Sequence, residues 1–398
     1  MEKCIWCYRL KEIDLGIRVL VVFGTRPEAI KMAPLCHALL ADSHVFETTI
    51  CVTGQHREML DQVLNLFEIK PDIDLNIMKH GQDLTDVAAA ILVGMRDVFL
   101  DYKPDLVLVH GDTATTLATA IAAFYAKIPI GHVEAGLRTH DINAPFPEEF
   151  NRQVASKIAR WHFAPTESSR ANLIGEGYSA SEIAVTGNTV IDSLFWVLKR
   201  LDDNSDRKKR IVQSLGKELP FDWQNSKYVL ITGHRRENFG EGFINICQAL
   251  AELAQKYPDV NFVYPVHLNP NVQDPVISLL SKIENIHLIP PLDYEPFVYL
   301  LKGCYLVLTD SGGIQEEAPS LGKPVLVMRE VTERPEAVDA GTVKLVGANK
   351  TKIIDETSAL LDEAASYAVM SHAHNPYGDG NACSRILKVI KDAFNEKS

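Results

Sequence analysis

The sequence lacks the features of several common protein classes. Its longest apolar runs, such as Val19 to Phe23, are of strand length and far from the roughly 18 residues that a membrane-spanning helix needs. The first 20 residues contain no small-residue cleavage site of the signal-peptide kind. Basic residues are outnumbered, with 40 Lys and Arg against 52 Asp and Glu, so the net charge is −12. We therefore expect neither a membrane nor a nucleic-acid partner, because nucleic acids require a basic surface.

Motifs for the common cofactors are also missing. There is no Walker A lysine motif, no H-E-x-x-H and no pair of C-x-x-C motifs. Gly175, Gly177 and Ala180 spell G-x-G-x-x-A, but they follow a predicted helix and precede a strand, which is the reverse of the dinucleotide-binding order. We therefore expect no NAD and no metal. The spacing of four histidines favours structural or substrate-facing roles over metal binding: His110, His132, His162 and His267.

The seven cysteines are scattered and odd in number. Four of them lie in or beside apolar segments, which predicts buried free thiols: Cys36, Cys51, Cys247 and Cys304. Free thiols fit a reducing cytoplasm. Cys4 and Cys7 form a single C-x-x-C, which is weak support for zinc or redox chemistry.

The length of 398 residues suits two domains of roughly 150–200 residues each. Strand-like runs alternate with helical segments, first at 17–23, 48–53, 105–110, 129–133, 161–164 and 182–185. A second series follows at 228–232, 261–265, 286–289, 305–309 and 324–328. This alternation predicts two doubly wound α/β domains, each with a parallel sheet covered by helices on both faces.

The expected boundaries follow from this pattern. Residues 1–16 form an N-terminal extension, 17–189 the first Rossmann-like domain and 190–380 the second. A polar stretch, 202–217, follows a predicted helix at 190–201 and is expected near the domain boundary. The final helix, within 381–398, has no following strand, and we expect it to pack back on the first domain.

Charged residues cluster where the predicted strands end. Ligands of open parallel sheets bind beyond the carboxyl ends of the strands. The residues that follow those ends include Arg26, Lys31, Asp112, Glu134, His234, Arg235, Glu317 and Arg334. Loop polarity explains any one of these residues but not the whole set.

The turn Ser311-Gly312-Gly313 opens a helix, and its backbone N–H groups and the helix dipole suit a phosphate. A Gly-Gly turn is also compatible with a merely tight connection. Glu317, on the first turn of this helix, is placed either to accept hydrogen bonds from sugar hydroxyls or to stabilise the helix start. We expect Glu317 and Arg334 at the rim of the cleft.

Asp112 and Glu134 follow neighbouring strands of one βαβ unit and should lie side by side. Glu148 starts a helix, and His234 comes from the second half of the chain. The four groups are acid–base candidates that converge on one substrate. The alternative is that Glu148 or Glu149 only stabilises its helix N-terminus.

Nine motifs in one order resemble a known family, the bacterial non-hydrolysing UDP-N-acetylglucosamine 2-epimerases. The motifs are Gly24-Thr25-Arg26-Pro27-Glu28, Thr53-Gly54-Gln55-His56-Arg57, His110-Gly111-Asp112-Thr113, Gly131-His132-Val133-Glu134-Ala135-Gly136-Leu137-Arg138, Gly187-Asn188-Thr189, Thr232-Gly233-His234-Arg235-Arg236-Glu237, Tyr264-Pro265-Val266-His267, Thr309-Asp310-Ser311-Gly312-Gly313 and Glu333-Arg334-Pro335-Glu336. The resemblance runs from about Ile17 to Arg385, and the extension through Gly16 departs from it.

The resemblance implies a glycosyltransferase-B-like fold, a homodimer, and conversion of UDP-N-acetylglucosamine to UDP-N-acetylmannosamine for surface polysaccharide. It also implies elimination of UDP to a 2-acetamidoglucal and re-addition. Acid–base roles fall on Asp112, Glu134, Glu148 and His234. UDP contacts fall on Arg26, Lys31, Phe297, Ser311, Gly312, Gly313, Glu317 and Arg334. A second, activating nucleotide site is implied near Gln55, Glu58, Arg235 and His267.

The chemistry agrees with the residues, because loss of diphosphate from C1 assists removal of the weakly acidic proton at C2. The leaving group needs cations and N–H donors, and the proton needs a carboxylate or histidine. Three alternatives stay open. A glycosyltransferase would need an acceptor groove, a hydrolysing epimerase would release free sugar, and a nucleotide-sugar sensor would not need paired acids.

Overall fold

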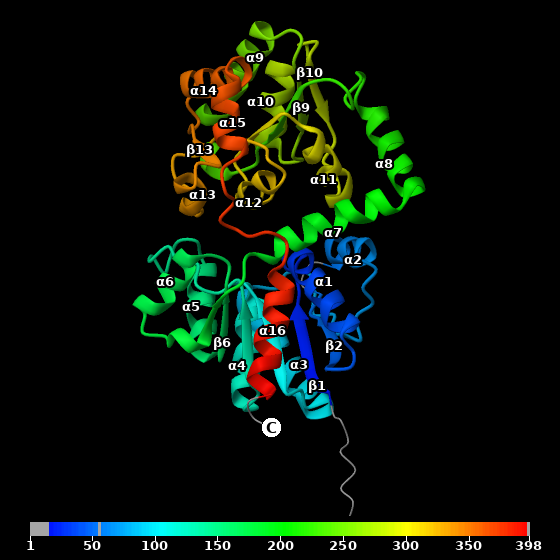
Figure 1. Ribbon diagram of the computed structural model, residues 1–398, viewed down its shortest axis with the longest axis vertical. Helices are drawn as coiled ribbons and strands as arrows, with labels where there is room; N and C mark the ends of the chain where they lie inside the picture. Colours follow the sequence, from blue (N-terminus) through cyan, green and yellow to red (C-terminus); the bar gives the residue numbers. More distant parts are fainter. Residues whose placement is uncertain (1–15, 55–56, 396–398) are drawn as a thin grey trace, which may run out of the picture.

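The computed structural model describes residues 16–54 and 57–395 of the chain (Figure 1). Two parallel β-sheets form the cores of two stacked α/β domains, which confirms the predicted fold class. The first sheet has seven strands in the order β3-β2-β1-β4-β5-β6-β7, and the second has six in the order β10-β9-β8-β11-β12-β13. In both sheets the order reverses beside the first strand, which is where a doubly wound fold opens a crevice for ligands.

The first sheet and its helices take up the first half of the chain. Its strands are β1 (Ile17–Phe23), β2 (Phe46–Val52), β3 (Ile73–Asp74), β4 (Leu106–His110), β5 (Ile130–Val133), β6 (Trp161–Ala164) and β7 (Ile183–Val185). Its helices are α1 (Arg26–Ala41), α2 (Arg57–Leu66), α3 (Leu84–Tyr102), α4 (Ala114–Tyr125), α5 (Glu148–Ile158) and α6 (Glu167–Gly175).

The second sheet follows two connecting helices, α7 (Thr189–Asp203) and α8 (Ser205–Glu218). Its strands are β8 (Tyr228–Thr232), β9 (Asn261–Pro265), β10 (Ile286–Ile289), β11 (Leu306–Thr309), β12 (Val325–Val327) and β13 (Val343–Leu345). Its helices are α9 (Glu241–Lys256), α10 (Pro270–Leu280), α11 (Tyr294–Gly303), α12 (Gly312–Ser320), α13 (Pro335–Asp339), α14 (Lys350–Asp362) and α15 (Ala364–Ser371), and the chain closes with α16 (Ala382–Asn395).

Strand β1 shows why both faces of the sheet are covered. Successive side chains of a strand point to opposite faces. Val19, Val21 and Phe23 enter a core shared with α1, α2, α7 and α16, whereas Leu20 and Val22 enter a core shared with α3 and α4. All five side chains are buried, and such a strand therefore reads as a continuous apolar run.

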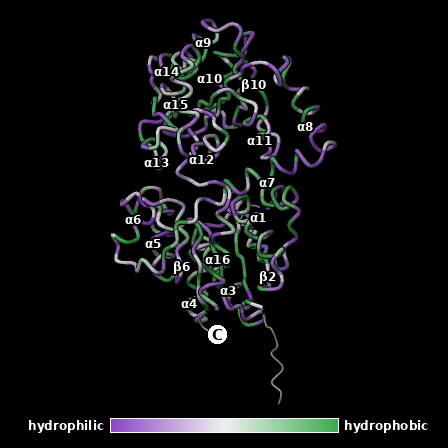
Figure 2. Tube along the Cα trace, viewed as in Figure 1, coloured by the Kyte–Doolittle hydropathy of each residue, from purple (hydrophilic) through white to green (hydrophobic). Residues whose placement is uncertain are grey.

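The sequence missed three elements. Strands β3 and β13 are two and three residues long, too short for a periodic signal. The polar stretch 202–217 is largely helix α8, which packs through the buried Leu215 and otherwise faces outward. Figure 2 shows α8 as a mainly hydrophilic segment at the outside of the molecule, which is why its composition resembles that of a linker.

Helix α16 packs against α1 and α7 of the first domain after the chain has crossed back from the second (Figure 1). Cys383, Ile386 and Ile390 belong to the same core cluster as β1. The ring of Phe394 lies 5.9 Å from that of Trp161 in β6. The C-terminal helix therefore completes the apolar cover of the first sheet.

The cysteines of the described residues are free and buried, as predicted for four of them: Cys36, Cys51, Cys247, Cys304 and Cys383. Cys4 and Cys7 lie outside the described residues. Among the helices of residues 16–54 and 57–395, none is long and apolar enough to cross a membrane.

Replacing Ile386 by alanine should destabilise the first domain, because it empties space in a core built from five helices and the sheet. We expect a loss of about 2–5 kcal/mol, seen as a lower melting temperature in calorimetry. Lys388→Ala on the exposed face of the same helix is the control, with a loss below about 0.5 kcal/mol. Equal melting temperatures for the two variants would mean that α16 adds no stability.

Candidate active site between the two domains

Asp112 and Glu134 leave the sheet at adjacent points. Strands β4 and β5 pair in parallel with His110 opposite Val133. The N–H of Gly111 donates to the carbonyl of Val133 at 2.9 Å, so the register holds to the ends of both strands. The two carboxylates therefore emerge beside each other, and both line the same cavity.

The turn after β5 aims Glu134 at this cavity. Glu134 itself has φ of 61° and Gly136 has φ of 92°. A Cβ on Gly136 would lie 2.3 Å from the carbonyl oxygen of Ser169, so only glycine fits there. A left-handed glutamate is uncommon, and such conformations persist where the surrounding structure holds them.

Glu134 is held by three partners. Its Oε2 forms an ion pair with Lys31, accepts a hydrogen bond from the Asn188 amide at 2.9 Å, and lies 3.7 Å from Nε2 of His110. Burial alone would raise the pKa of Glu134, but Lys31, His110 and Arg334 outweigh it and hold the pKa well below its usual range. The carboxylate is therefore ionised. Burial also lowers the pKa of His110 to about 4, so its imidazole is neutral at pH 7.

Asp112 is in a different environment. Its Oδ2 lies 2.6 Å from Nη2 of Arg152, and its carbonyl accepts from Asn151 at 2.8 Å, both on α5. Burial raises the pKa of Asp112, with a further contribution from Glu134 and opposition from Arg152. Two neighbouring carboxyl groups whose pKa values are pushed in opposite directions suit opposite roles in proton transfer.

The cavity, of roughly 480 Å³, takes residues from both domains. The first domain contributes Lys31, His110, Asp112, Glu134, Glu148 and Arg152. The second contributes Arg235, Glu333 and Arg334. Three acids of the first domain therefore lie in one cavity with Arg235 and Arg334 of the second domain, and these two arginines suit an anionic ligand.

Arg334 reaches the site from the loop before α13 and forms an ion pair with Glu316 of α12. Glu316 is 1% exposed and also accepts from the Asn188 amide at 3.0 Å. Burial would lower the pKa of Arg334, but Glu316 and Glu134 raise it, so the guanidinium stays charged. Cations from both domains, Lys31 and Arg334, are therefore present where a diphosphate would enter.

Ser311 is the N-cap residue of α12, which begins at Gly312. Asp310 beside it is buried and accepts from the backbone N–H groups of His234 at 2.9 Å and Arg235 at 2.8 Å. This carboxylate fixes the loop after β8 against the start of α12. The arrangement leaves the helix N-terminus facing the cleft side of the sheet, as a phosphate seat requires.

The expectation that Glu317 stands at the cleft rim is wrong. Glu317 is buried and accepts from the hydroxyl of Tyr294 at 3.1 Å. Burial raises the pKa of Glu317 to about 8. Arg334 lines the cavity, but its pairing with Glu316 leaves it only slightly exposed. The rim positions were inferred from the places of these residues after predicted strand ends, which carry no information on pairing with side chains of other elements.

The cavity lining includes some predicted residues and not others. Those outside the lining are Arg26, Glu58, Phe297, Ser311, Gly312, Gly313, Glu317, His234 and His267. His234 and His267 stack with their rings 5.6 Å apart, and Glu58 is exposed on α2. Burial lowers the pKa of His234, with Asp310 opposing. Gln55 lies outside the described residues.

Several polar residues of the site were not among the predicted ones. Glu28 is buried and accepts from Thr25 at 2.8 Å and from Thr113 at 2.6 Å, so it joins the loops after β1 and β4. Asn188 and Glu316 join the two domains. A buried acid inside a helix is the signal that could have marked Glu28 and Glu316, whereas Asn188 reads as an ordinary helix cap.

Within residues 16–54 and 57–395, no group of three or more His, Cys, Asp or Glu side chains is arranged to hold a metal ion. His110, His132 and His162 are buried in the first sheet. His132 interacts through Nε2 with the carbonyl of Gly111 at 2.7 Å, which is a structural role.

Comparison with known proteins identifies the family. Residues 38–391 match the model of the UDP-N-acetylglucosamine 2-epimerase family. The chain belongs to this family. It is 60% identical over 376 residues to the UDP-N-acetylglucosamine 2-epimerase of Yersinia pestis, covering 94% of this chain and 99% of that one. The Escherichia coli K12 enzyme is 58% identical over the same length.

A solved relative gives the same result for the fold. The UDP-GlcNAc 2-epimerase of Neisseria meningitidis, a structure bound to UDP-GlcNAc, superposes with a TM-score of 0.86 at 54% identity and covers 94% of this chain and 100% of that one. The protein is therefore an epimerase, that is, an isomerase, with a glycosyltransferase-B-like fold. The cleft cavity is the natural place for its chemistry.

Replacing Glu317 by glutamine should change the pH dependence of stability. A glutamate with a folded pKa of about 8 and an unfolded pKa of about 4.3 favours the folded state fully below pH 4.3. That contribution is lost as pH rises through 8, at up to about 1.4 kcal/mol per pH unit. We expect Glu317→Gln to melt like the wild type at pH 5 and at a higher temperature at pH 8.5.

Calorimetry at the two pH values tests this, with the exposed Glu167→Gln as the control. A difference between Glu317→Gln and wild type that is the same at both pH values would show that Glu317 does not titrate in this range.

Proposed function

We propose that this enzyme interconverts UDP-N-acetylglucosamine and UDP-N-acetylmannosamine by elimination and re-addition of UDP. The proton at C2 passes to a protein group, the C1–O bond breaks, and its electron pair leaves with UDP. The resulting 2-acetamidoglucal then takes a proton on the other face of C2 while UDP oxygen rebonds to C1. The observation that carries the proposal is a cavity between the domains in which two carboxylates with opposed pKa shifts stand beside Lys31 and Arg334.

The leaving diphosphate is assigned to the cations and N–H donors of the cleft. Lys31 and Arg334 line the cavity, and Arg26 begins α1 between Thr25 and Pro27, which also line it. Ser311, Gly312 and Gly313 supply the N-terminus of α12. Donors placed where charge develops stabilise the transition state. Glu317 and Phe297 are assigned to the nucleoside.

Four groups are assigned to proton transfer at C2. Asp112, Glu134 and Glu148 line the cavity together, and His234 stands on the second domain outside its lining. Inversion requires removal on one face and delivery on the other, so two separate groups act. We propose that closure of the domains on the ligand brings His234 toward the three acids.

A second, activating nucleotide site is proposed beside the first. Arg235 lines the cavity and would lie 3.8 Å from a Cβ on Gly312, so it stands between the cavity and the start of α12. His267 stacks on His234, and Glu58 and Gln55 are assigned to the same site from the first domain. We further propose a cytoplasmic enzyme that supplies N-acetylmannosamine units for surface polysaccharide, with buried free thiols supporting the compartment.

The mechanism predicts solvent exchange at C2. Without added NAD or metal, and with a chelator present, product formed in D2O should carry deuterium at C2. Asp112→Asn, Glu134→Gln, Glu148→Gln and His234→Ala should each lose about 10²–10⁴-fold in kcat, because general acid–base groups contribute that much. Each variant should still bind UDP in calorimetric titration.

An NMR time course with UDP-N-acetylglucosamine alone makes the measurement. Epimer with fully protonated C2 would exclude exchange with solvent. Free N-acetylmannosamine would indicate a hydrolysing enzyme, and no change without an acceptor would indicate a glycosyltransferase. Wild-type rates in all four variants would place the chemistry on other residues.

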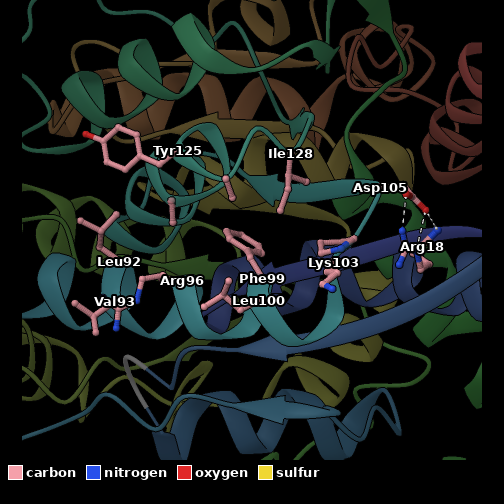
Figure 3. A pocket seen from close by; sticks show the side chains of 13 residues that line it. Arg18, Leu92, Val93, Arg96, Phe99, Leu100, Lys103, Asp105, Tyr125 and Ile128 are labelled. Atoms are coloured by element: carbon pink, nitrogen blue, oxygen red, sulfur yellow. Dashed lines mark hydrogen bonds and ion pairs between the residues drawn. The ribbon is translucent and has the colours of Figure 1, made fainter.

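We propose that the enzyme is a homodimer joined through the face formed by α3 and the end of α4. Large apolar side chains are exposed there, with Leu100 66% and Tyr125 73% exposed. They border a groove of roughly 630 Å³. Figure 3 shows Leu92, Val93 and Leu100 on one side of this groove and Tyr125 on the other. Exposed apolar patches of this kind mark association surfaces.

Charging this face should separate the protomers. Light scattering after gel filtration should give the dimer mass for wild type and about half of it for Leu100→Glu combined with Tyr125→Ala, because a buried unpaired charge is costly. Val369→Glu, at an exposed apolar residue of α15 in the second domain, is the control and should stay dimeric. A dimer in both variants would place the interface elsewhere.

A further inference from the structure

Asn188 stands where the chain crosses between the domains. It is 3% exposed and precedes α7, at the first crossing. Its N–H donates to the carbonyl of Tyr377 at 2.8 Å, in the second crossing. The two crossings touch there, because a Cβ on Gly187 would lie 3.4 Å from the Cα of Gly378. Asn188 is thus fixed at the point about which the domains would move.

The oxygen and the nitrogen of the Asn188 side-chain amide have different hydrogen-bond partners. Its Oδ1 accepts from the N–H of Val190 at 3.1 Å and caps α7. Its Nδ2 donates to Glu134 at 2.9 Å and to Glu316 at 3.0 Å. One amide nitrogen therefore connects an acid–base candidate of the first domain to a buried carboxylate of the second. The cap and the bridge are separable by substitution.

The other groups that act on Glu134 are charged or titratable. They are Lys31 of α1, His110 of β4, Arg334 of the second domain and, in the opposite sense, Asp112 beyond β4. Lys31 and Arg334 line the cavity and are the cations that a diphosphate attracts. The amide of Asn188 is neutral and is not drawn to the ligand. If Lys31 and Arg334 turn to bind a diphosphate, the amide of Asn188 can keep its hydrogen bonds to Glu134 and Glu316.

We propose that Asn188 is a positioning residue of the epimerase reaction. Its amide holds Glu134 aimed at the sugar and tied to Glu316 of the second domain once Lys31 and Arg334 engage the diphosphate. A neutral donor holds the carboxylate and lowers its basicity less than a paired lysine does. This inference rests on the proposed role of Glu134 in proton transfer.

Two variants separate the bridge from the cap. Serine and aspartate are both good N-cap residues, so both variants should keep the start of α7. Asn188→Ser should melt within about 4 °C of wild type, and Asn188→Asp should melt lower, because it buries an unpaired charge beside two carboxylates. Neither keeps the amide donor, and aspartate adds a negative charge between two carboxylates. We expect kcat to fall about 10–100-fold in Asn188→Ser and further in Asn188→Asp, because a hydrogen bond to a charged group is lost.

UDP affinity should change less than about threefold in Asn188→Ser, because the residues assigned to the nucleotide are intact and the two altered hydrogen bonds go to Glu134 and Glu316. The matched control is Asn204→Ser, which replaces the N-cap of α8 at an exposed position. This variant should keep the wild-type kcat.

The pH profile distinguishes positioning from a structural role. Loss of a donor, and then gain of a like charge, each disfavour the ionised form of Glu134. The acid limb of the kcat/KM profile should therefore move to higher pH in the order wild type, Asn188→Ser, Asn188→Asp. Loss of activity through misfolding would not move it.

An active wild type whose kcat and pH profile are unchanged in both variants would overturn the role of Asn188 alone. A wild type that does not epimerise its substrate would overturn the proposed function, and the inference with it. Glu134→Gln with wild-type kcat would likewise remove the group that Asn188 is said to position.

Discussion

A buried row of four charged side chains joins the two domains. Lys31, Glu134, Glu316 and Arg334 stand in the order cation, anion, anion, cation, and the Asn188 amide separates the two anions. Charges removed from water are tolerated only when they are paired and hydrogen-bonded. Each of these side chains therefore needs a partner on another element. The row stays paired only while the two domains keep their relative position.

The fold supplies these positions by simple means. Parallel strands bring their carboxyl ends to one edge, so Asp112 and Glu134 need only follow β4 and β5. Gly136 turns the chain sharply enough to send Glu134 into the cleft. Helix α7 is buried against the second sheet at its start and against the first core along the rest, so it fixes Asn188 between the domains.

Local sequence patterns predicted what depends on local structure. Strands such as β8 and β9 match the predicted residues because a strand buried on both faces is a continuous apolar run. Asp112 and Glu134 were predicted to line the cleft because they follow two strands of this kind, and both line the cavity. Burial of Glu317 and the bridge through Asn188 depend on packing between residues more than 20 positions apart, including Tyr294 and Glu316, and no local pattern encodes it.

The row of charges also means that each carboxylate of the cleft has a counter-ion from the protein itself. Lys31 pairs with Glu134 and Arg334 pairs with Glu316, and both cations help to hold the pKa of Glu134 low. A carboxylate paired with two cations is a weak base. A diphosphate that draws those cations away raises its basicity at the moment the substrate is in place. Asp112, whose pKa is raised by burial in the same cavity, is the neighbouring acid–base candidate. In the mechanism that we propose, the capture of the leaving diphosphate and the increase in the basicity of Glu134 are one electrostatic event.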